Sequence, residues 1–332
     1  MARRRDIGTD DPRVRVRPGR GSRPRTKRRP DYSAAPRGRV WSVDRGRYGV
    51  ILSDGTEVTA IKAREIPRGG IVVGDQVALT GDLSGRKDTL ARIVEVDERS
   101  TVLRRSSEDG ETSGQERVMV ANADQLMIVT ALADPPPRPG MIDRCLVAAY
   151  DATMRAILLL TKADLASDRE LRELYEPLDL TIITTALNSG TQRGLEQARD
   201  ALRGHHTVLV GHSGVGKSTL VNALVPDADR RIGGVNAVTG RGRHTSTSQV
   251  AFTLPGGGTI IDTPGVRSFG LAHVSNEDVL RAFDDLAHAA TACPRACEHR
   301  DSSPQCALDA WVTDPRSRAR LASYRRLVAA RD

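Results

Sequence analysis

The stretch that decides the fold is GHSGVGKS, residues 211–218, which matches the pattern G-x-x-x-x-G-K-[ST]. The apolar run TVLV leads into it, and KSTLVNALV leaves it with the composition of a helix, so the stretch joins a strand to a helix. Its glycines let the backbone curl until successive N–H groups face phosphate oxygens, and the start of the helix adds its dipole. The stretch therefore predicts a phosphate-binding loop in an α/β domain.

The polar residues of this loop have separate predicted tasks. Lys217 places a positive charge beside the β- and γ-phosphates, which makes it a candidate catalytic residue, and Ser218 offers its hydroxyl to Mg²⁺. The residues expected to contact the nucleotide here are Gly211, His212, Ser213, Gly214, Val215, Gly216, Lys217, Ser218 and Thr219. The loop alone does not choose between ATP and GTP.

The segment TIIDTPG, residues 259–265, narrows the nucleotide to GTP. An apolar strand ends at Asp262, whose carboxylate we expect to reach Mg²⁺ through water, and the chain then turns at Gly265 beside the γ-phosphate. Asp262 lies 45 residues after Lys217, a spacing typical of the D-x-x-G motif of GTPases. The preceding TSQVAFTLPGGGTIID predicts a hairpin with PGGG as its turn.

Between these two motifs, VTGRGRHTSTS at residues 238–248 has the composition of a mobile loop. A GTPase needs a hydroxyl here that senses Mg²⁺ and the γ-phosphate. Thr245 and Thr247 are the candidates, and Ser246 is a third choice that the sequence leaves open.

The residue that orients the attacking water does not follow the usual GTPase pattern. Many GTPases carry a glutamine directly after D-x-x-G, but this chain has Val266, which cannot hold a water. We therefore expect slow intrinsic hydrolysis that a partner accelerates. His244 is a candidate for positioning the water, and the alternatives are a histidine that contacts RNA or one that is simply solvated.

Guanine recognition requires a carboxylate that accepts from the ring N1–H and the exocyclic amine, and a lysine whose stem covers the base. The usual motif, N-K-x-D, does not occur after D-x-x-G, but LLLTKADL upstream contains it with threonine in place of asparagine. The predicted base-reading residues are Thr161, Lys162, Ala163 and Asp164, followed by Thr185 and Ala186, whose backbone N–H groups would reach the guanine carbonyl. Taken alone, the same segment could be a strand-to-helix turn with a capping aspartate.

The order of these motifs is base reader, phosphate-binding loop, switch loop and D-x-x-G, which is a circular permutation. Such a permutation is physically acceptable because chain termini tend to lie close together on a domain surface. From about residue 118, strands alternate with helices, which predicts a parallel sheet covered on both faces.

Residues 38–98 predict a different architecture. Five short β-strands separated by glycine-rich turns are expected at 39–43, 48–52, 57–61, 76–80 and 89–96. This density of strands favours a small barrel of the OB type, which either binds an oligonucleotide or only packs against its neighbour. The polar residues 99–117 that follow predict a mobile connector.

The net charge of +8 is concentrated at the N-terminus. Residues 1–39 contain fourteen Lys or Arg and four Asp, a charge of +10, so the remaining residues carry −2. A Pro-, Gly- and Arg-rich arm with few apolar residues is expected to be disordered. Nucleic acid is its expected partner, and a solvated leader that only aids solubility is the alternative.

The C-terminal region contains CPRACEHRDSSPQC, residues 293–306, after a predicted helix that begins at a Ser275–Asp278 capping box. Three thiols and an imidazole suit tetrahedral zinc, and four protein ligands leave no open position for catalysis. The expected ligands of one structural zinc ion per monomer are Cys293, Cys297, His299 and Cys306. A final helix from Pro315 offers a second basic surface or an ordinary solvated face through Arg316, Arg318, Arg320, Arg325 and Arg326.

From its composition we expect the chain to be cytoplasmic. No apolar run approaches the roughly 18 residues of a membrane span, and the N-terminus lacks the apolar segment of a secretory signal. Four cysteines in 332 residues do not make a disulfide framework, and Cys145 is expected to be a small buried apolar residue. We expect a monomer without a membrane partner.

Several features of the chain occur together in one known family. They are the predicted barrel, the motif order TKAD–GHSGVGKST–DTPG, the segments GRGRHTST and PGGGTIIDTPGVRSFG, and the closing Cys/His site. Through these features the chain resembles the ribosome small subunit-dependent GTPase A family (RsgA, YjeQ or YloQ) over about residues 38–310. The resemblance implies a GTPase that acts in late maturation of the 30S ribosomal subunit. It also implies contacts of barrel and zinc domain with 16S rRNA, GTP hydrolysis to GDP and phosphate that the ribosome stimulates, and Mg²⁺ bound with GTP.

The chain departs from that family at Thr161, where asparagine is common, and in the zinc spacing, which differs by one residue on each side of Cys297-Glu298-His299. The alternatives are an RNA-binding P-loop ATPase and an RNA-binding module regulated by a nucleotide, without a role specific to the 30S subunit. We predict a multidomain chain with five parts: a disordered basic arm (1–37), an OB-type barrel (38–98), a polar connector (99–117), a circularly permuted GTPase domain (118–272) and a helical zinc-binding domain (273–332).

Overall fold

The computed structural model describes residues 31–106, 116–187, 192–225, 228, 249–263, 269–271 and 273–331. Residues 35–332 form one unit, which holds every helix and strand described below. Most of the predicted basic arm lies outside the described residues. Among the helices of the described part, none is long and apolar enough to cross a membrane.

Five strands of the N-terminal region close into a barrel. They are β1 (Arg37–Asp44), β2 (Arg47–Leu52), β3 (Glu57–Lys62), β4 (Gln76–Gly81) and β5 (Ala91–Val96). Their order is β1-β2-β3-β5-β4, and pairing of β4 with β1 completes the circle. Alternate residues such as Val50, Leu79 and Ile93 fill the interior, so the predicted OB-type barrel is confirmed.

One strand of the barrel continues into the neighbouring sheet. The first half of β1 pairs with β4, whereas Ser42 and Val43 pair with β12 (Gln249–Thr253). The register of β1 against β2 shifts at Trp41, and such a bulge bends a strand from one partner toward another. Trp41 packs against the core cluster that includes Phe252, so the barrel and the α/β region share one eleven-stranded sheet.

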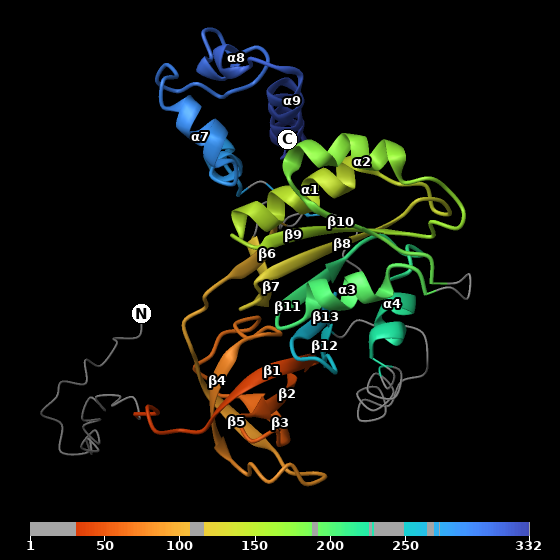
Figure 1. Ribbon diagram of the computed structural model, residues 1–332. Helices are drawn as coiled ribbons and strands as arrows, with labels where there is room; N and C mark the ends of the chain where they lie inside the picture. Colours follow the sequence, from red (N-terminus) through yellow and green to blue (C-terminus); the bar gives the residue numbers. More distant parts are fainter. Residues whose placement is uncertain are drawn as a thin grey trace, which may run out of the picture. The chain divides into compact units, whose positions relative to one another are not determined.

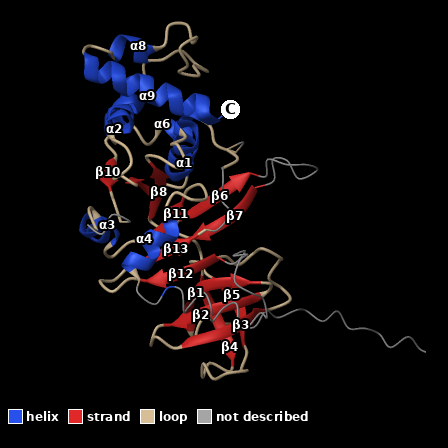
Figure 2. Ribbon diagram, turned by 90° about the vertical axis from the view of Figure 1, so that its right-hand side faces the viewer, coloured by secondary structure: helices blue, strands red, loops and turns tan. Residues whose placement is uncertain are grey.

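The prediction that residues 99–117 form a mobile polar connector is wrong near both ends of that segment. Strands β6 (Val102–Ser106) and β7 (Glu116–Ala121) pair antiparallel in a separate two-stranded sheet (Figure 2). Leu103 and Val120 are buried, so apolar contacts and backbone pairing outweigh the polar composition of the segment. The middle of this connector lies outside the described residues.

The α/β region is the predicted sheet covered on both faces, in the order β10-β9-β8-β11-β13-β12. Its remaining strands are β8 (Gln125–Ala131), β9 (Arg155–Thr161), β10 (Thr181–Thr184), β11 (His206–Val210) and β13 (Thr259–Asp262). The flanking elements are α1 (Pro139–Asp151), α2 (Arg169–Tyr175) and η2 (Glu176–Leu178) on one face, and α3 (Leu195–Leu202) and α4 (Lys217–Leu224) on the other (Figure 1).

The C-terminal region consists of α6 (Asn276–Leu280), α7 (Asp284–Ala290), α8 (Ala307–Trp311) and α9 (Pro315–Arg331). The predicted capping box of Ser275 and Asp278 is present at the start of α6. The single helix expected after it breaks before Phe283, whose buried ring lies edge-on between Tyr150 of α1 and Tyr324 of α9.

The arginines of α9 do not form the continuous basic surface that was one prediction for this helix. Arg320 pairs with Asp285 and Asp179, Arg325 with Asp309 and Asp301, and Arg326 with Asp143, and all three side chains are less than 30% exposed. Their acidic partners neutralise them. Arg316 and Arg318 are exposed, although Arg316 lies 3.5 Å from Asp179.

Candidate functional site

A cavity of about 350 Å³ lies where several strands of the parallel sheet end. Thr161 closes β9, Thr185 follows β10, and the phosphate-binding loop follows β11, so neighbouring strands deliver these residues to one edge. The residues that line the cavity are Thr161, Lys162, Asp164, Thr185, Leu187, Ser213, Gly214, Gly216, Lys217, Ser218 and Thr219. The structure thus brings the predicted base reader and the predicted phosphate-binding loop together, although more than 40 residues separate them in the chain.

The backbone of the loop requires glycine at two positions for different reasons. Gly216 precedes α4 with φ at +97°, a conformation that side chains rarely adopt. A Cβ at Gly211 would lie 2.2 Å from the carbonyl oxygen of Val129, so this glycine permits close packing of the loop against β8. The loop can therefore turn directly from β11 into α4 and present its N–H groups at the helix start.

The side chain of Lys217 folds back over its own loop. Its Nζ donates to the carbonyl oxygens of Gly211 at 2.6 Å and His212 at 3.0 Å. Burial lowers the pKa of Lys217, whereas the negative charge of Asp262 opposes that shift. The ammonium group is thus held beside the cavity in a place where a bound anion would stabilise its charge.

Asp262 stands at the end of β13 with one carboxylate oxygen unsatisfied. Its Oδ1 is buried and has no hydrogen-bond partner in the part of the chain that the structure describes. Burial raises the pKa of this carboxyl, and the charge of Lys217 counteracts the rise. The next residue, Thr263, is fixed because its hydroxyl donates to the carbonyl of Leu209 at 2.8 Å. A buried carboxylate oxygen that has no partner among the described residues, on a side chain close enough to Lys217 for their charges to interact, suits a hard cation such as Mg²⁺.

The base-reading segment is tied to the phosphate-binding loop by Thr161. Its hydroxyl lies 2.6 Å from the carbonyl oxygen of Val215 and 3.3 Å from that of Thr130, and its side chain is buried. Lys162 has a φ of +58°, and its Nζ donates to the carbonyl of Asp134. The N–H of Ala163 donates to the carbonyl of Thr185, so the two base-reading segments are joined to each other.

Two details of the base-reading end differ from the sequence prediction. The N–H of Ala186 donates to the carbonyl of Arg193 at 3.2 Å, and Ala186 is buried and does not itself line the cavity. Leu187, which sequence reasoning left out, contributes to the cavity wall instead. Its position directly after Thr185-Ala186 was the signal that could have identified it, because a flat base favours an apolar neighbour.

Several predicted residues lie outside the described residues. They are the switch-loop candidates His244, Thr245, Ser246 and Thr247, together with Gly265 and Val266 after Asp262. Of the residues predicted to bind magnesium, the structure therefore describes only Ser218 and Asp262.

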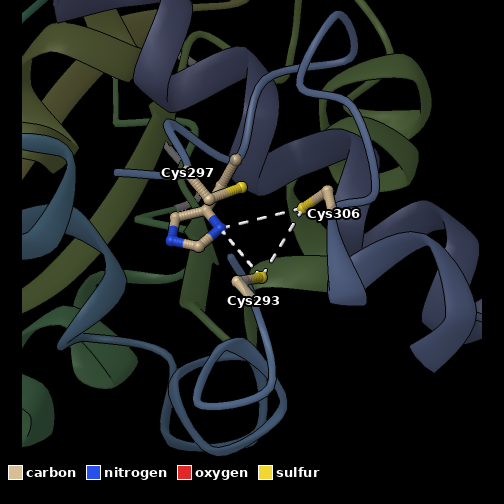
Figure 3. A group of neighbouring side chains, drawn as sticks. Cys293, Cys297 and Cys306 are labelled. Atoms are coloured by element: carbon tan, nitrogen blue, oxygen red, sulfur yellow. Dashed lines mark hydrogen bonds between the residues drawn. The ribbon is translucent and has the colours of Figure 1, made fainter. Parts of the chain in front are cut away.

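The cysteine–histidine group of the C-terminal region is a second candidate site. Figure 3 shows the side chains of Cys293, Cys297 and Cys306 pointing toward one another. The Sγ atoms of Cys293 and Cys306 lie 4.0 Å apart, and they lie 3.5 Å and 3.7 Å from Nδ1 of His299. The four ligand atoms all fall within 4.8 Å of one another. Tetrahedral zinc with bonds of 2.0–2.3 Å needs ligand separations of about 3.3–3.8 Å, so the group fits a metal ion.

The surroundings of this group also suit a resident cation. Burial raises the pKa of Cys306 to about 11, and the neighbouring sulfurs act in the same direction, so a positive ion is needed to stabilise several thiolates together. The N–H of Ala307 donates to Sγ of Cys293 at 3.2 Å. Arg325 of α9 holds the carbonyl of His299 at 3.1 Å, which fixes the ligand loop against this helix.

Comparisons with known proteins identify the family of the chain. A family model described as RsgA GTPase matches residues 96–272. The small ribosomal subunit biogenesis GTPase RsgA of Ectopseudomonas mendocina is 40% identical over 267 residues, which cover 78% of this chain and 74% of that protein. The protein of the same name from Pseudomonas aeruginosa is 39% identical over 267 residues, or 78% of this chain and 75% of that one.

Solved structures are similar over most of the chain. The crystal structure of YjeQ from Thermotoga maritima matches with a TM-score of 0.63 and 24% identity, over 88% of this chain and 98% of that one. The structure of YloQ, described as a circularly permuted GTPase, matches with a TM-score of 0.58 and 21% identity, over 87% of this chain and 93% of that one. At these identities the likeness establishes the shared fold.

Proposed function

This chain belongs to the RsgA GTPase family, and we propose that it hydrolyses GTP to GDP and phosphate while it acts on the small ribosomal subunit during biogenesis of that subunit. The observation that carries the proposal is that Asp164, Thr185, Gly216 and Lys217 all line one cavity. A carboxylate encoded before the phosphate-binding loop shares a pocket with that loop, as guanine recognition in a permuted GTPase requires. The names of the relatives supply the subunit on which the enzyme would act.

Guanine is the base that this cavity would select. Asp164 would accept hydrogen bonds from the guanine N1–H and amine, while adenine would turn the acceptor N1 toward the same carboxylate. Thr161 supports this task because its hydroxyl connects the base-reading segment to Val215 of the phosphate-binding loop. A competition between GTP and ATP for binding separates this proposal from the alternative of an ATPase, in which ATP would displace GTP.

The phosphates would lie on the loop from Gly211 to Ser218, with Lys217 near the β- and γ-phosphates. Ser218 and Asp262 would hold Mg²⁺, and Thr245 or Thr247 of the switch loop would complete its ligands. When bound, Mg²⁺ would supply positive charge that offsets the negative charge developing on the phosphates during hydrolysis. The unpartnered Oδ1 of Asp262 is the observation that supports this assignment.

Hydrolysis would need help from the partner, because Val266 cannot orient the attacking water. His244 is our candidate for that task, once contact with the ribosomal subunit positions the switch loop. The barrel and the C-terminal region would contact 16S rRNA, and the chain would act as a monomer.

The metal of the C-terminal site would be zinc, with one ion per chain. Thiolates and an imidazole are the ligands that zinc prefers, and a set of four leaves no position for a substrate. We therefore assign the ion a structural role in holding the loop of residues 293–306 against α9.

The experiment that tests this function is GTP hydrolysis measured alone, with 30S subunits and with 50S subunits. We expect a low rate alone, a large increase with 30S subunits and little change with 50S subunits. Equal stimulation by both subunits, or by neither, would contradict the proposed role.

A further inference from the structure

Arg144 of α1 joins two segments that are far from it in the chain. Its Nε and Nη2 donate to the carbonyl oxygen of Phe269 at 3.0 Å and 2.7 Å, and its Nη1 donates to the carbonyl of Ala330 at 3.1 Å. Phe269 follows the D-x-x-G motif, whereas Ala330 lies in the last turn of α9. One guanidinium group therefore connects the chain that leaves the nucleotide site to the end of the C-terminal helix.

The contact with Phe269 fixes the chain soon after the D-x-x-G motif. The side chains of Phe269 and Leu271 are 0% and 1% exposed, so this part of the backbone is anchored in the core. Thr263, the second residue of the motif, is anchored by its hydrogen bond to the carbonyl of Leu209. The position of Phe269 thus sets one of the two fixed ends between which Gly265 and Val266 stand in the sequence.

The contact with Ala330 reaches the metal site through α9. The last carbonyl groups of a helix have no partner within the helix and lie at the negative end of its dipole, so a guanidinium is well placed there. The same helix carries Arg325, which holds His299 of the metal loop and pairs with Asp309. A force on the metal loop would therefore act on α9.

The helix α9 is packed firmly enough against α1 to pass such a force on. Arg326 pairs with the buried carboxylate of Asp143 at 3.0 Å and lies over the ring of Tyr175 at 5.1 Å. Tyr324 of α9 is fully buried and meets Phe283 edge-on. Closely packed elements of this kind shift together rather than deform, which is the physical requirement for coupling between sites.

We propose that Arg144 is a positioning residue for GTP hydrolysis, which couples the metal-bearing C-terminal region to the segment that follows D-x-x-G. This inference rests on the proposed function, because it concerns the stimulation of hydrolysis by the small subunit. Contact of the C-terminal region with the subunit moves α9, and Arg144 carries that movement to Phe269. The subunit then raises kcat, while the affinity for GTP stays unchanged.

The test is a pair of lysine substitutions at the same interface. A lysine cannot make the forked contact of an arginine, so Arg144→Lys loses the simultaneous grip on Phe269 and Ala330. Arg320→Lys is the matched control, because Arg320 also joins α9 to Asp179 and to the carbonyl of Pro177, and its contacts within the described part of the chain do not include Phe269. Arg144→Gln provides a second, neutral variant, and thermal melting verifies that all three variants are folded.

We expect Arg144→Lys and Arg144→Gln to reduce the kcat measured with 30S subunits by roughly fivefold to thirtyfold. Their intrinsic hydrolysis, KM for GTP and metal content should stay close to those of the unchanged protein, and Arg320→Lys should keep most of the stimulation. Full stimulation of both Arg144 variants, or an equal loss in Arg320→Lys, would overturn the inference alone. An unchanged protein that 30S subunits do not stimulate would overturn the proposed function and the inference with it.

Discussion

The nucleotide cavity and the cysteine–histidine group differ in how far the chain satisfies their polar atoms. The cavity has about 350 Å³ of space and an exposed Asp164 in its wall. Asp262, whose charge interacts with that of the cavity residue Lys217, has a buried oxygen without a hydrogen-bond partner in the described part of the chain. In the C-terminal group, four ligand atoms lie within 4.8 Å of one another, and His299 and Cys306 are buried. The first arrangement suits a ligand that binds and leaves, whereas the second suits an ion that stays.

The two sites also differ in how the chain builds them. The cavity takes residues from the ends of β9, β10 and β11, which only the folded sheet brings together. The metal ligands all come from residues 293–306, a single loop. We therefore expect substitutions in the cavity to change GTP binding or hydrolysis and leave the metal content intact. Substitutions in the loop of residues 293–306 should remove the metal and leave intrinsic GTP hydrolysis nearly unchanged.

The largest effect should come from Lys217→Ala. This change removes the charge that Gly211 and His212 hold beside the cavity. We expect GTP turnover to fall by roughly a hundredfold to a thousandfold, because one preorganised electrostatic contact with the transferring group is worth that much. Phosphate release measures the turnover, and metal analysis should give the same content as in the unchanged protein.

Lys87→Ala serves as the control for this prediction, because Lys87 is an exposed lysine of the barrel region. It should leave turnover measured without ribosomal subunits unchanged. A Lys217→Ala protein that kept its turnover, or lost its metal, would break the division between the two sites.

A smaller effect is expected from Asp164→Asn. The amide would donate where the carboxylate accepts, so GTP binding should weaken by roughly tenfold to a hundredfold. Xanthosine triphosphate, which presents a carbonyl in place of the guanine amine, should become the better ligand. Competitive binding of the two nucleotides measures this exchange.

The exposed Glu170 of α2 offers a matched control, as Glu170→Gln makes the same chemical change outside the cavity. If Asp164→Asn kept its preference for GTP, Asp164 would not be the residue that recognises the base, and only the phosphate-binding role of the cavity would stand.

Thr161→Ala should have an effect of several-fold. The change removes the hydroxyl that bonds to Val215 at 2.6 Å and leaves that buried carbonyl with one partner fewer. Loss of such a bond costs about 1 kcal/mol, which corresponds to roughly fivefold weaker GTP binding. Titration with GTP measures the change. A Thr161→Asn variant should keep its affinity for GTP, because the amide of asparagine can donate to the same carbonyl.

The Thr161 contact also indicates where sequence reasoning reaches its limit. The phosphate-binding loop, the D-x-x-G strand, the barrel strands and the clustering of the three cysteines with His299 could be predicted because each is encoded in a short, local pattern. The role of Thr161 depends on Val215, which is 54 residues away, so the sequence showed only a departure from asparagine.

The same limit explains the errors in the C-terminal region. The arginines of α9 resemble a basic surface in the sequence, but the partners of Arg320 and Arg326 lie on other elements, Asp179 and Asp143 among them. The joining of β1 to β12 was equally hidden, since it depends on a bulge at Trp41 and two paired residues. These features depend on contacts between segments that are distant in the sequence, and local sequence patterns do not predict such contacts.

The smallest effect on intrinsic turnover should come from removal of the metal. Cys306→Ser, or treatment with a chelator, should abolish the content of about one zinc ion per chain and lower the melting temperature, because Cys306 belongs to the core that α9 shares with α1. Intrinsic GTP hydrolysis should stay within roughly twofold, as no metal ligand lines the nucleotide cavity. Cys145→Ala, which changes the buried cysteine of α1, should keep the metal. If metal loss reduced intrinsic hydrolysis as much as Thr161→Ala does, the two sites would be coupled even without the ribosomal subunit.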